Sequence, residues 1–336
     1  MLSAFITALA GTELNAREAT VLRDAKPCGI ILFARNVATP EQVRRLIGSA
    51  GDAIGSDILV LIDQEGGRVR RLLPPHWREL PPAAAYGRLY ERDPEEACRG
   101  ARLAARLTAA ELRAVGINTN CAPVLDVPAK GGHDIIGDRA YGRQVKQVVA
   151  LGRAVADGYA AGGVLPVIKH MPGHGRATKD SHLELPVVAA SRAALSRTDF
   201  ATFRALADMP AAMTAHVVFS AIDAHGPAST SQRVTQEIMR DAIGFDGLLM
   251  SDDLGMKALS GTMQERAKAV IEAGSDLALV CSGDLSDTEA VAEAVPHLAG
   301  DSLARFQRAC GIFRQQEPFD VAEARSSLEH ALRAGA

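Results

Sequence analysis

Short apolar runs alternate with longer stretches of helical character along most of the chain. Strand–helix alternation repeated about eight times predicts a parallel sheet covered by helices. The first run is also short enough to begin a helix, because periodicity cannot decide so short a segment. The eight runs are Ser3–Leu9, Gly29–Phe33, Ile58–Asp63, Ile117–Asp126, Val164–His170, Ala211–Phe219, Gly247–Asp252 and Asp276–Cys281.

The stretches between the runs predict helices, many of them rich in Ala, Arg, Leu and Glu. We find no linker, low-complexity tract or long repeat, and 336 residues fit one α/β barrel. The sequence therefore predicts a single domain over residues 1–336, with closing helices at about 302–333. The predicted helices are Pro40–Ala53, Pro94–Val115, Gln147–Ala161, Ala193–Ala207, Thr235–Ile243, Met263–Ala273, Ser286–Val295, Ser302–Gln316 and Asp320–Arg333.

Polar residues in or at the ends of the runs favour a closed barrel over an open doubly wound sheet. They are Asp63, Asp126, Lys169, His170, His216 and Asp252. In a barrel the carboxyl ends of all strands meet on one face, so these side chains would line one pocket. In an open sheet they would be spread along an edge. No G-x-G-x-x-G sequence follows the first or second run, which weakens a dinucleotide-binding fold. We predict a (β/α)8 TIM barrel of the α/β class.

Charge and hydropathy narrow the possible partners. Lys and Arg number 37 and Asp and Glu number 40, so the formal net charge is −3. This balance gives no reason to expect a nucleic acid or an anionic membrane as partner, and a small neutral ligand fits better.

No apolar stretch approaches the roughly 18 residues of a membrane span, and the N-terminus lacks the basic region of a signal peptide. The five cysteines are scattered along the sequence, which is typical of reduced thiols rather than disulfides. We expect a cytoplasmic protein without a cofactor, and we favour a monomer while the oligomeric state stays open.

The stretch Lys169–His182 concentrates titratable groups directly after a predicted strand. A proline and two glycines interrupt regular structure there, and such a βα loop is a common place for catalytic residues. Asp180 and His182 are two residues apart, so they can hydrogen-bond within a turn, and a carboxylate would fix the imidazole tautomer. A single histidine in such a loop could equally be a solvent-exposed residue without a catalytic role. Three histidines among several charged residues favour a functional site.

An acidic pair, Asp252 and Asp253, ends another predicted strand. Carboxylates are rare inside strands. If the strand ends at Met250 or Ser251, Asp252 points into the pocket and Asp253 caps the following helix. Spacing alone leaves open whether both residues are helix caps.

Two glycine-containing loops carry arginines. In Asp63–Arg71 a glycine pair allows close backbone approach, and the arginines offer fork-shaped donors to hydroxyl, carboxylate or carbonyl oxygens. This loop alone could equally bind phosphate. In Ile136–Gly142 the arginine is Arg139.

Together these motifs resemble glycoside hydrolase family 3, in particular its single-domain bacterial β-N-acetylhexosaminidases. Each motif alone is weak, but they occur in the family's order between Gly29 and Cys281, and the combination is specific. Met171 and Ala140 differ from the residues usual in their motifs, which affects fine specificity, because no catalytic group is lost. The resemblance lies in Lys169–Gly175, Asp180–His182, Ser251–Leu254, Asp63–Arg68, Ala122–Asp126 and Gly137–Arg139.

The resemblance implies a retaining exo-glycosidase that hydrolyses terminal, non-reducing β-linked N-acetylglucosamine. By position, Asp252 would be the nucleophile, His182 the acid/base and Asp180 the partner of His182. The positions that would hold the sugar are Asp63, Arg71, Arg139, Lys169 and His170. The implied substrates are muropeptide fragments of peptidoglycan recycling, in which N-acetylglucosamine is joined to anhydro-N-acetylmuramic acid.

The implied pair is unusual, because most glycosidases use two carboxyl groups. A carboxylate can still attack the anomeric carbon while an imidazolium protonates the leaving oxygen, and the neutral imidazole can then activate water. A histidine side chain titrates near pH 6.5 in peptides, roughly where both roles are possible. Hinges at Pro172, Gly173 and Gly175 would let the loop close on the sugar.

Three other functions fit parts of the pattern. A metal-dependent barrel hydrolase would use His170, His174, His182, His216 and Asp252. Pro172 and Gly173 disfavour the helical turn that His170 and His174 would need, and we expect no metal. A non-catalytic sugar-binding barrel would not need Asp252 and His182 together. A β-glucosidase of the same family is the main alternative, although the loop that carries His182 favours the N-acetyl sugar.

Overall fold

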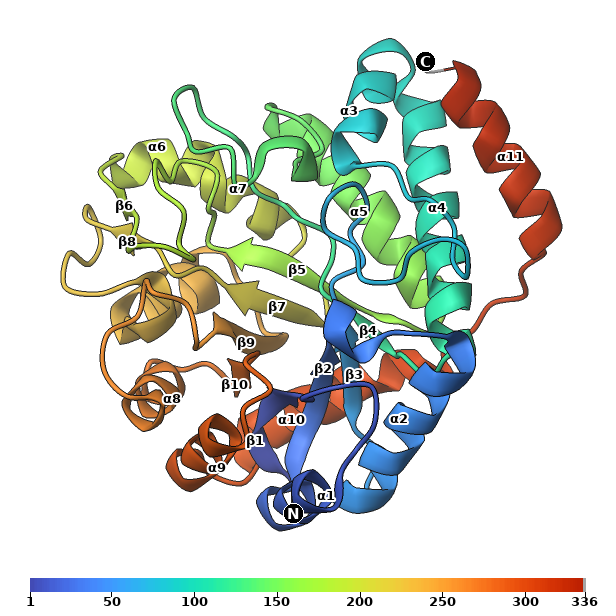
Figure 1. Cartoon of the computed structure of the whole chain (residues 1–336). Coiled ribbons are helices and arrows are strands. Elements are labelled where there is room, and N and C mark those ends of the chain that lie inside the picture. Colours follow the sequence, from blue (N-terminus) through green and yellow to red (C-terminus); the bar gives the residue numbers. More distant parts are fainter. Residues whose placement is uncertain (335–336) are drawn as a thin grey trace.

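Eight parallel strands close into a barrel with helices around it (Figure 1). A computed structural model describes the backbone of residues 1–334 and the side chains of residues 1–329. Pairing of Ile6 with Leu279 joins the last strand to the first and closes the ring. The predicted (β/α)8 barrel is confirmed. In order around the barrel the strands are β1 (Ser3–Ala8), β2 (Pro27–Leu32), β3 (Leu59–Ile62), β4 (Thr119–Asn120), β5 (Leu165–Met171), β7 (Ala211–Thr214), β9 (Leu248–Asp253) and β10 (Leu277–Val280).

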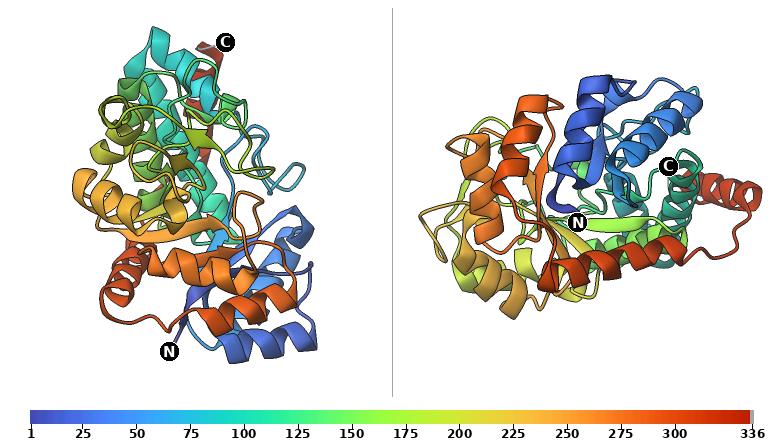
Figure 2. Two further views of the ribbon diagram at one scale, coloured as in Figure 1. Left: turned by 90° about the vertical axis from the view of Figure 1, so that its left-hand side faces the viewer. Right: turned by 90° about the horizontal axis from the view of Figure 1, so that it is seen from below.

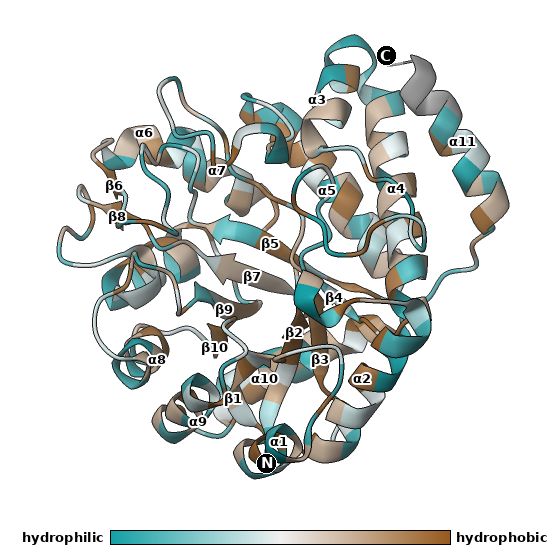
Figure 3. Cartoon of the chain, viewed as in Figure 1, coloured by the Kyte–Doolittle hydropathy of each residue, from teal (hydrophilic) through white to brown (hydrophobic). Residues whose placement is uncertain are grey.

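Successive side chains of each strand point alternately into the barrel and onto the helices. In β2, Ile31 belongs to a cluster built from the barrel strands, whereas Ile30 and Leu32 pack in the cluster shared with the surrounding helices. Because both faces are buried, the strands are apolar along most of their length, as Figure 3 shows. Each predicted run overlaps a barrel strand, with ends that differ by one or two residues for β2, β5 and β9, and the ambiguous first run is β1.

The helices form the outer layer of the barrel. Helix α2 begins after Thr39, whose side chain accepts a hydrogen bond from the backbone N–H of Gln42. Helix α8 begins with a capping box between Thr262 and Glu265. The α-helices are α1 (Ala16–Ala25), α2 (Pro40–Ile54), α3 (Ala83–Arg92), α4 (Pro94–Ala114), α5 (Val145–Ala161), α6 (Arg192–Arg197), α7 (Asp199–Ala205), α8 (Met263–Glu272), α9 (Leu285–Ala294), α10 (Gly300–Cys310) and α11 (Val321–Ala334).

Several predicted elements differ from the structure. The predicted helix Ala193–Ala207 is two helices, α6 and α7, separated at Thr198, whose hydroxyl donates to the backbone oxygen of Ala194 at 3.0 Å and so competes for helical hydrogen bonding. The segment after Arg233 is a π-helix, η4 (Val234–Ala242). Helix α10 ends at Cys310 and continues as a 3-10 turn, η5 (Gly311–Arg314). The run Ala211–Phe219 holds a second short strand, β8 (Val218–Phe219), which pairs with β6 (Val187–Val188) outside the barrel.

Helix α10 covers the amino-terminal end of the barrel. Its residues Phe306 and Ala309 pack in the cluster of barrel side chains. The last helix, α11, lies against α4 on the outside of the molecule (Figures 1 and 2). The opposite end, where the strands finish, is therefore the end at which a site can open. No helix within residues 1–334 is long and apolar enough to cross a membrane.

Candidate active site

A cavity of about 350 Å³ opens at the carboxyl ends of the strands. Charged side chains from five segments of the barrel line it. They are Asp63 and Arg71 after β3, Arg139 after β4, Lys169 and His170 in β5, His182 in the loop that follows β5, and Asp252 in β9. The predicted nucleophile, the predicted acid/base and the five predicted sugar-binding residues thus all line this cavity. Asp180, the predicted partner of His182, does not line it but contacts His182.

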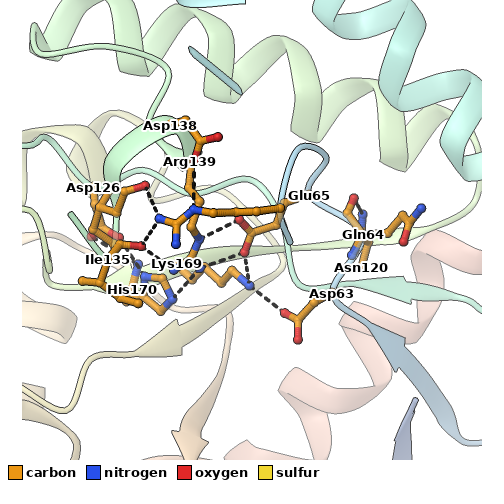
Figure 4. A network of polar contacts seen from close by, with 12 residues as sticks. Asp63, Gln64, Glu65, Asn120, Asp126, Ile135, Asp138, Arg139, Lys169 and His170 are labelled. Carbon is orange, nitrogen blue, oxygen red and sulfur yellow. Dashed lines mark hydrogen bonds and ion pairs between the residues drawn. The ribbon is translucent and has the colours of Figure 1, made fainter. Parts of the chain in front are cut away.

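Lys169 lies between two carboxylates on the floor of the cavity (Figure 4). Its Nζ atom is 2.8 Å from Asp63 and 2.7 Å from Glu65. Arg139 holds Glu65 from the other side with two parallel hydrogen bonds of 2.8 Å. Arg71 contacts the second oxygen of Asp63 at 3.2 Å. The result is a cluster in which each carboxylate meets two cations.

The charges in this cluster support one another. Burial raises the pKa values of Asp63 and Glu65, but the nearby cations outweigh it and hold both below their usual range. Burial lowers the pKa of Lys169, but Asp63 and Glu65 outweigh it and raise that pKa above its usual value. All three groups are therefore ionised at neutral pH. Such a cluster offers fixed donors and acceptors to ligand hydroxyls.

Asp126 orients His170 from below the cavity. Its Oδ2 atom is 2.7 Å from Nδ1 of His170, and its Oδ1 accepts the backbone N–H of His174 at 2.6 Å. The other ring nitrogen of His170 is 3.4 Å from Arg139. Burial raises the pKa of Asp126, but His170 outweighs it and the pKa lies below the usual value. The ionised carboxylate thus accepts a hydrogen bond from Nδ1–H of His170, which directs Nε2 toward the cavity.

Gln64 shapes the loop that carries Arg71. Its side-chain oxygen accepts the backbone N–H groups of Arg71 at 2.8 Å and Leu72 at 3.0 Å. Its own backbone N–H donates to the side chain of Asn120 at 2.9 Å, and Asn120 donates back to the Gln64 carbonyl at 3.0 Å. This buried network fixes the point at which Asp63 and Arg71 meet.

Asp252 projects from the end of β9. One of its oxygens accepts the backbone N–H of Asp253 at 2.8 Å. Burial raises the pKa of Asp252, but His170 and His216 outweigh it, so the pKa lies below the usual value. An ionised carboxylate at a strand end of this cavity is the form that a nucleophile needs.

Asp253 does not cap a helix, contrary to the prediction. Strand β9 continues through Asp253, which pairs with Leu279, and the next helix begins only after Thr262. The Asp253 side chain accepts the backbone N–H groups of Gly255 and Cys281 at 2.9 and 3.0 Å. It therefore joins the end of β9 to the end of β10, and this leaves Asp252 to face the cavity.

The loop that follows β5 carries His182 on its exposed side. The His182 side chain is 60% exposed, and its Nδ1 atom lies 2.8 Å from Asp180. Ser181, between them, is buried, and its hydroxyl lies 3.0 Å from Nε2 of His174. Burial lowers the pKa of His174 to about 4, so this ring is neutral. The loop is thus anchored at Ser181, while His182 faces outward.

Two residues that were expected to line the pocket lie beneath it. Asp126 and His216 are fully buried. The His216 ring lies 2.7 Å from the Ser229 hydroxyl and 3.0 Å from the backbone oxygen of Asp253. Both residues lie beyond the last residue of their strands, β4 and β7. A place in an apolar run therefore does not by itself put a side chain into the pocket.

Glu65 and the contact between His174 and Ser181 were not assigned from the sequence. Glu65 stands two residues after Asp63 in a loop with several arginines, and this spacing is the signal that could have indicated a second acidic anchor. The contact of His174 with Ser181 spans seven residues of irregular loop. No periodicity relates residues in such a loop, so this contact had no sequence signal.

Among the described side chains, no group of three or more His, Cys, Asp and Glu residues is arranged to hold a metal ion. The cavity instead combines an ionised carboxylate, an imidazole on a loop and a charged cluster. This set suits acid–base and nucleophilic chemistry on a ligand rich in hydroxyl groups.

Comparison with known proteins gives consistent matches over almost the whole chain. A family model described as the glycosyl hydrolase family 3 N terminal domain matches residues 3–309. A beta-hexosaminidase from Bordetella pertussis is 39% identical over 329 residues, which cover 97% of this chain and 92% of that protein. The structure of NagZ from Neisseria gonorrhoeae in complex with N-trifluoroacetyl-D-glucosamine is 31% identical with a TM-score of 0.86, over 99% of this chain and 96% of the other. A glycoside hydrolase family 3 beta-N-acetylglucosaminidase from Paenibacillus sp. str. FPU-7 is 33% identical with a TM-score of 0.82, and the match covers 99% of this chain but only 62% of that protein.

Proposed function

The chain belongs to glycoside hydrolase family 3 and is a β-N-acetylhexosaminidase, and we propose that it releases terminal β-linked N-acetylglucosamine with retention, through a covalent intermediate on Asp252. The observation that carries this proposal is that Asp252 and His182 line one cavity, with Asp180 in contact with His182. Both residues of a two-step mechanism are thus available to one bound sugar.

In the first step an oxygen of Asp252 attacks the anomeric carbon as the bond to the leaving oxygen breaks. His182, as an imidazolium, donates its proton to that oxygen, so the aglycone leaves as an alcohol. The depressed pKa of Asp252, despite its burial, supports the role of nucleophile, because the carboxylate is unprotonated at neutral pH.

In the second step water attacks the anomeric carbon and breaks its bond to Asp252. The neutral imidazole of His182 accepts the proton of this water, which restores the imidazolium and the free carboxylate. Two displacements at one carbon give net retention of configuration. The exposed position of His182 supports its exchange of protons with an aglycone and then with water.

The charged cluster would hold the sugar ring during both steps. An ammonium group has three N–H donors, and Asp63 and Glu65 engage two of those of Lys169. The third would donate to a sugar hydroxyl, while Asp63 would accept from another. Arg71, Arg139 and His170 would complete the contacts. Because these groups are held by one another, the ring would be positioned with little reorganisation.

The substrates would be muropeptide fragments released during peptidoglycan recycling in the cytoplasm, processed by a single catalytic domain over residues 1–336. The net charge of −3 supports a small carbohydrate over a polyelectrolyte. The names of the relatives support an N-acetylated amino sugar at the cleaved position.

A direct test compares the purified protein on an aryl N-acetyl-β-glucosaminide and on the matching aryl β-glucoside. We expect strong preference for the N-acetyl sugar and a β-anomer as the first product seen by NMR. The variants Asp252→Ala and His182→Ala should fold and lose most activity. Equal or faster turnover of the glucoside would instead favour a β-glucosidase, and an α-anomer would exclude retention.

A further inference from the structure

His216 is a buried imidazole near the proposed nucleophile that the proposed mechanism does not use. It follows β7, which is the barrel neighbour of β9, the strand that carries Asp252 (Figure 1). The His216 side chain is fully buried and does not line the cavity that Asp252 and His182 share. A buried group that does not reach the ligand can affect the reaction only through the groups around it.

Both ring nitrogens of His216 have partners. Nε2 lies 3.0 Å from the backbone oxygen of Asp253, and Nδ1 lies 2.7 Å from the hydroxyl of Ser229 in η3 (Ala228–Thr230). A carbonyl oxygen can only accept, so Nε2 carries the proton and donates. Burial lowers the pKa of His216 and outweighs the nearby carboxylates of Asp252 and Asp253, so the ring is neutral at neutral pH. Nδ1 is therefore an acceptor, and the Ser229 hydroxyl donates to it.

Asp253 is held on several sides. Its backbone oxygen accepts Nε2–H of His216 and also, at 3.2 Å, the backbone N–H of Met256. Its carboxylate accepts the backbone N–H groups of Gly255 and Cys281 at 2.9 and 3.0 Å. The contact with His216 ties Asp253 to the end of β7, and the contact with Cys281 ties it to the end of β10.

The orientation of the Asp252 carboxylate depends on Asp253. One oxygen of Asp252 accepts the backbone N–H of Asp253 at 2.8 Å. Within residues 1–329 this is the only hydrogen bond to the Asp252 side chain. This N–H group can hold the carboxylate in one direction only if Asp253 itself stays in place. Because both ring nitrogens of His216 are engaged elsewhere, His216 fixes Asp253 without binding the carboxylate of Asp252.

We propose that His216 is a positioning residue for the nucleophile, because its Nε2–H holds Asp253 and Asp253 directs the Asp252 carboxylate at the anomeric carbon. The proposal rests on the proposed function, since it requires Asp252 to be the nucleophile. A neutral imidazole suits this role, because an imidazolium at the same place would attract the carboxylate and make it less reactive. Asp252 takes part in both steps, so loss of this alignment slows both steps and leaves sugar binding unchanged.

Two amides that differ in reach test the contact between His216 and Asp253. In His216→Gln the side-chain nitrogen is as many bonds from the backbone as Nε2 of histidine, so its N–H can reach Asp253. In His216→Asn the nitrogen corresponds to Nδ1, so it can contact Ser229 but falls short of Asp253. The control, Ser302→Ala, removes a hydroxyl that donates to Asp276 at 2.6 Å at the opposite end of the barrel.

The measurements are kcat and KM on a series of aryl N-acetyl-β-glucosaminides, expressed per folded molecule, with the folded fraction taken from circular dichroism. We expect His216→Asn to lower kcat by about 10- to 100-fold and to change KM by less than about twofold. The loss should be equal for all phenols, because the proton donor is intact. His216→Gln should stay within about fivefold of the unmodified enzyme, and Ser302→Ala within about twofold.

A purely structural role would lower the folded fraction of His216→Asn and leave kcat per folded molecule unchanged. That result, or an equal loss of kcat in His216→Gln and His216→Asn, would overturn the positioning role and leave Asp252 as the proposed nucleophile. Asp252→Ala is measured alongside and should lose most activity. If Asp252→Ala keeps near-normal turnover, the proposed nucleophile is wrong and the inference falls with it.

Discussion

The Nδ1 atom of His182 lies 2.8 Å from an oxygen of Asp180, and the backbone N–H of His182 donates to the same oxygen at 2.9 Å. Burial raises the pKa of Asp180, but these hydrogen bonds outweigh it and the pKa lies below the usual value. An ionised carboxylate can only accept, so Nδ1 carries a proton. Nε2 is then the ring atom that would exchange protons with a substrate in the proposed mechanism.

Loss of this contact should impair protonation of the leaving group. We predict that Asp180→Ala lowers kcat/KM by about 10- to 100-fold for alkyl or sugar aglycones, which need a proton to leave. An aryl substrate with an acidic phenol should be much less affected. The measurement is the dependence of kcat/KM on phenol pKa across an aryl series, which should steepen in the variant. The exposed Asp57→Ala serves as control, and an unchanged dependence would contradict the role of Asp180.

Removal of the Lys169 charge should destabilise the barrel. Asp63 and Glu65 would each lose one of the two cations that pair with them, while both carboxylates stay buried. We predict that Lys169→Met lowers the free energy of unfolding by about 3–5 kcal/mol, measured by urea denaturation. The control, Lys179→Met, breaks an exposed pair with Glu184 and should cost less than about 1 kcal/mol. Similar costs for both variants would show that the cluster does not stabilise the fold.

Ser181 should hold the catalytic loop through His174. In Ser181→Ala the Nε2 atom of His174 loses its partner, and Nδ1 of this buried ring already has none. We predict faster amide exchange across residues 175–186, a lower kcat and a loss of about 1–3 kcal/mol in stability. The exposed Ser56→Ala should change none of these. Unaltered exchange in Ser181→Ala would mean that the loop is held by other contacts.

The neutral state of His174 should make stability depend on pH. Its pKa is about 4 in the folded protein, against an ordinary value of 6.5. Between these values the unfolded chain binds more protons, so stability falls as the pH falls from about 6.5 toward 4. The contribution is complete above the upper value and amounts to about 3 kcal/mol. Unfolding free energies measured from pH 7 to 4.5 should fall less steeply in His174→Gln, and parallel slopes would contradict this explanation.

The barrel could be predicted because its strands are buried on both faces. Each strand is therefore a continuous apolar run that stands out between helices, as in Leu59–Ile62 of β3. Helix α1 could not be predicted in the same way. Its buried residues include only two large apolar ones, Val21 and Leu22, so its periodicity is weak. The extent of the domain and the roles of the site residues remain predictions.

The site was harder to predict than the fold, because its contacts join residues that are far apart in the chain. Asp126 lies beneath His170, and Glu65 holds Arg139 across 74 residues. Local spacing carries no information on such pairs. Asp253 looked like a helix cap because the pattern did not show that β9 continues through it. Family resemblance, rather than spacing, distinguished Asp252 from Asp253 as the predicted nucleophile.

The central claim is that Asp252 forms a covalent bond to the sugar while His182 transfers protons. In His182→Ala, an aryl substrate with an acidic phenol needs no proton donor for the first step, but the second step lacks its base, so the intermediate should accumulate. Mass spectrometry of the quenched and digested protein then locates the adduct. We predict one N-acetylglucosaminyl group on the peptide that contains Asp252. An adduct on another residue, or steady turnover to the α-anomer without any adduct, would contradict the claim.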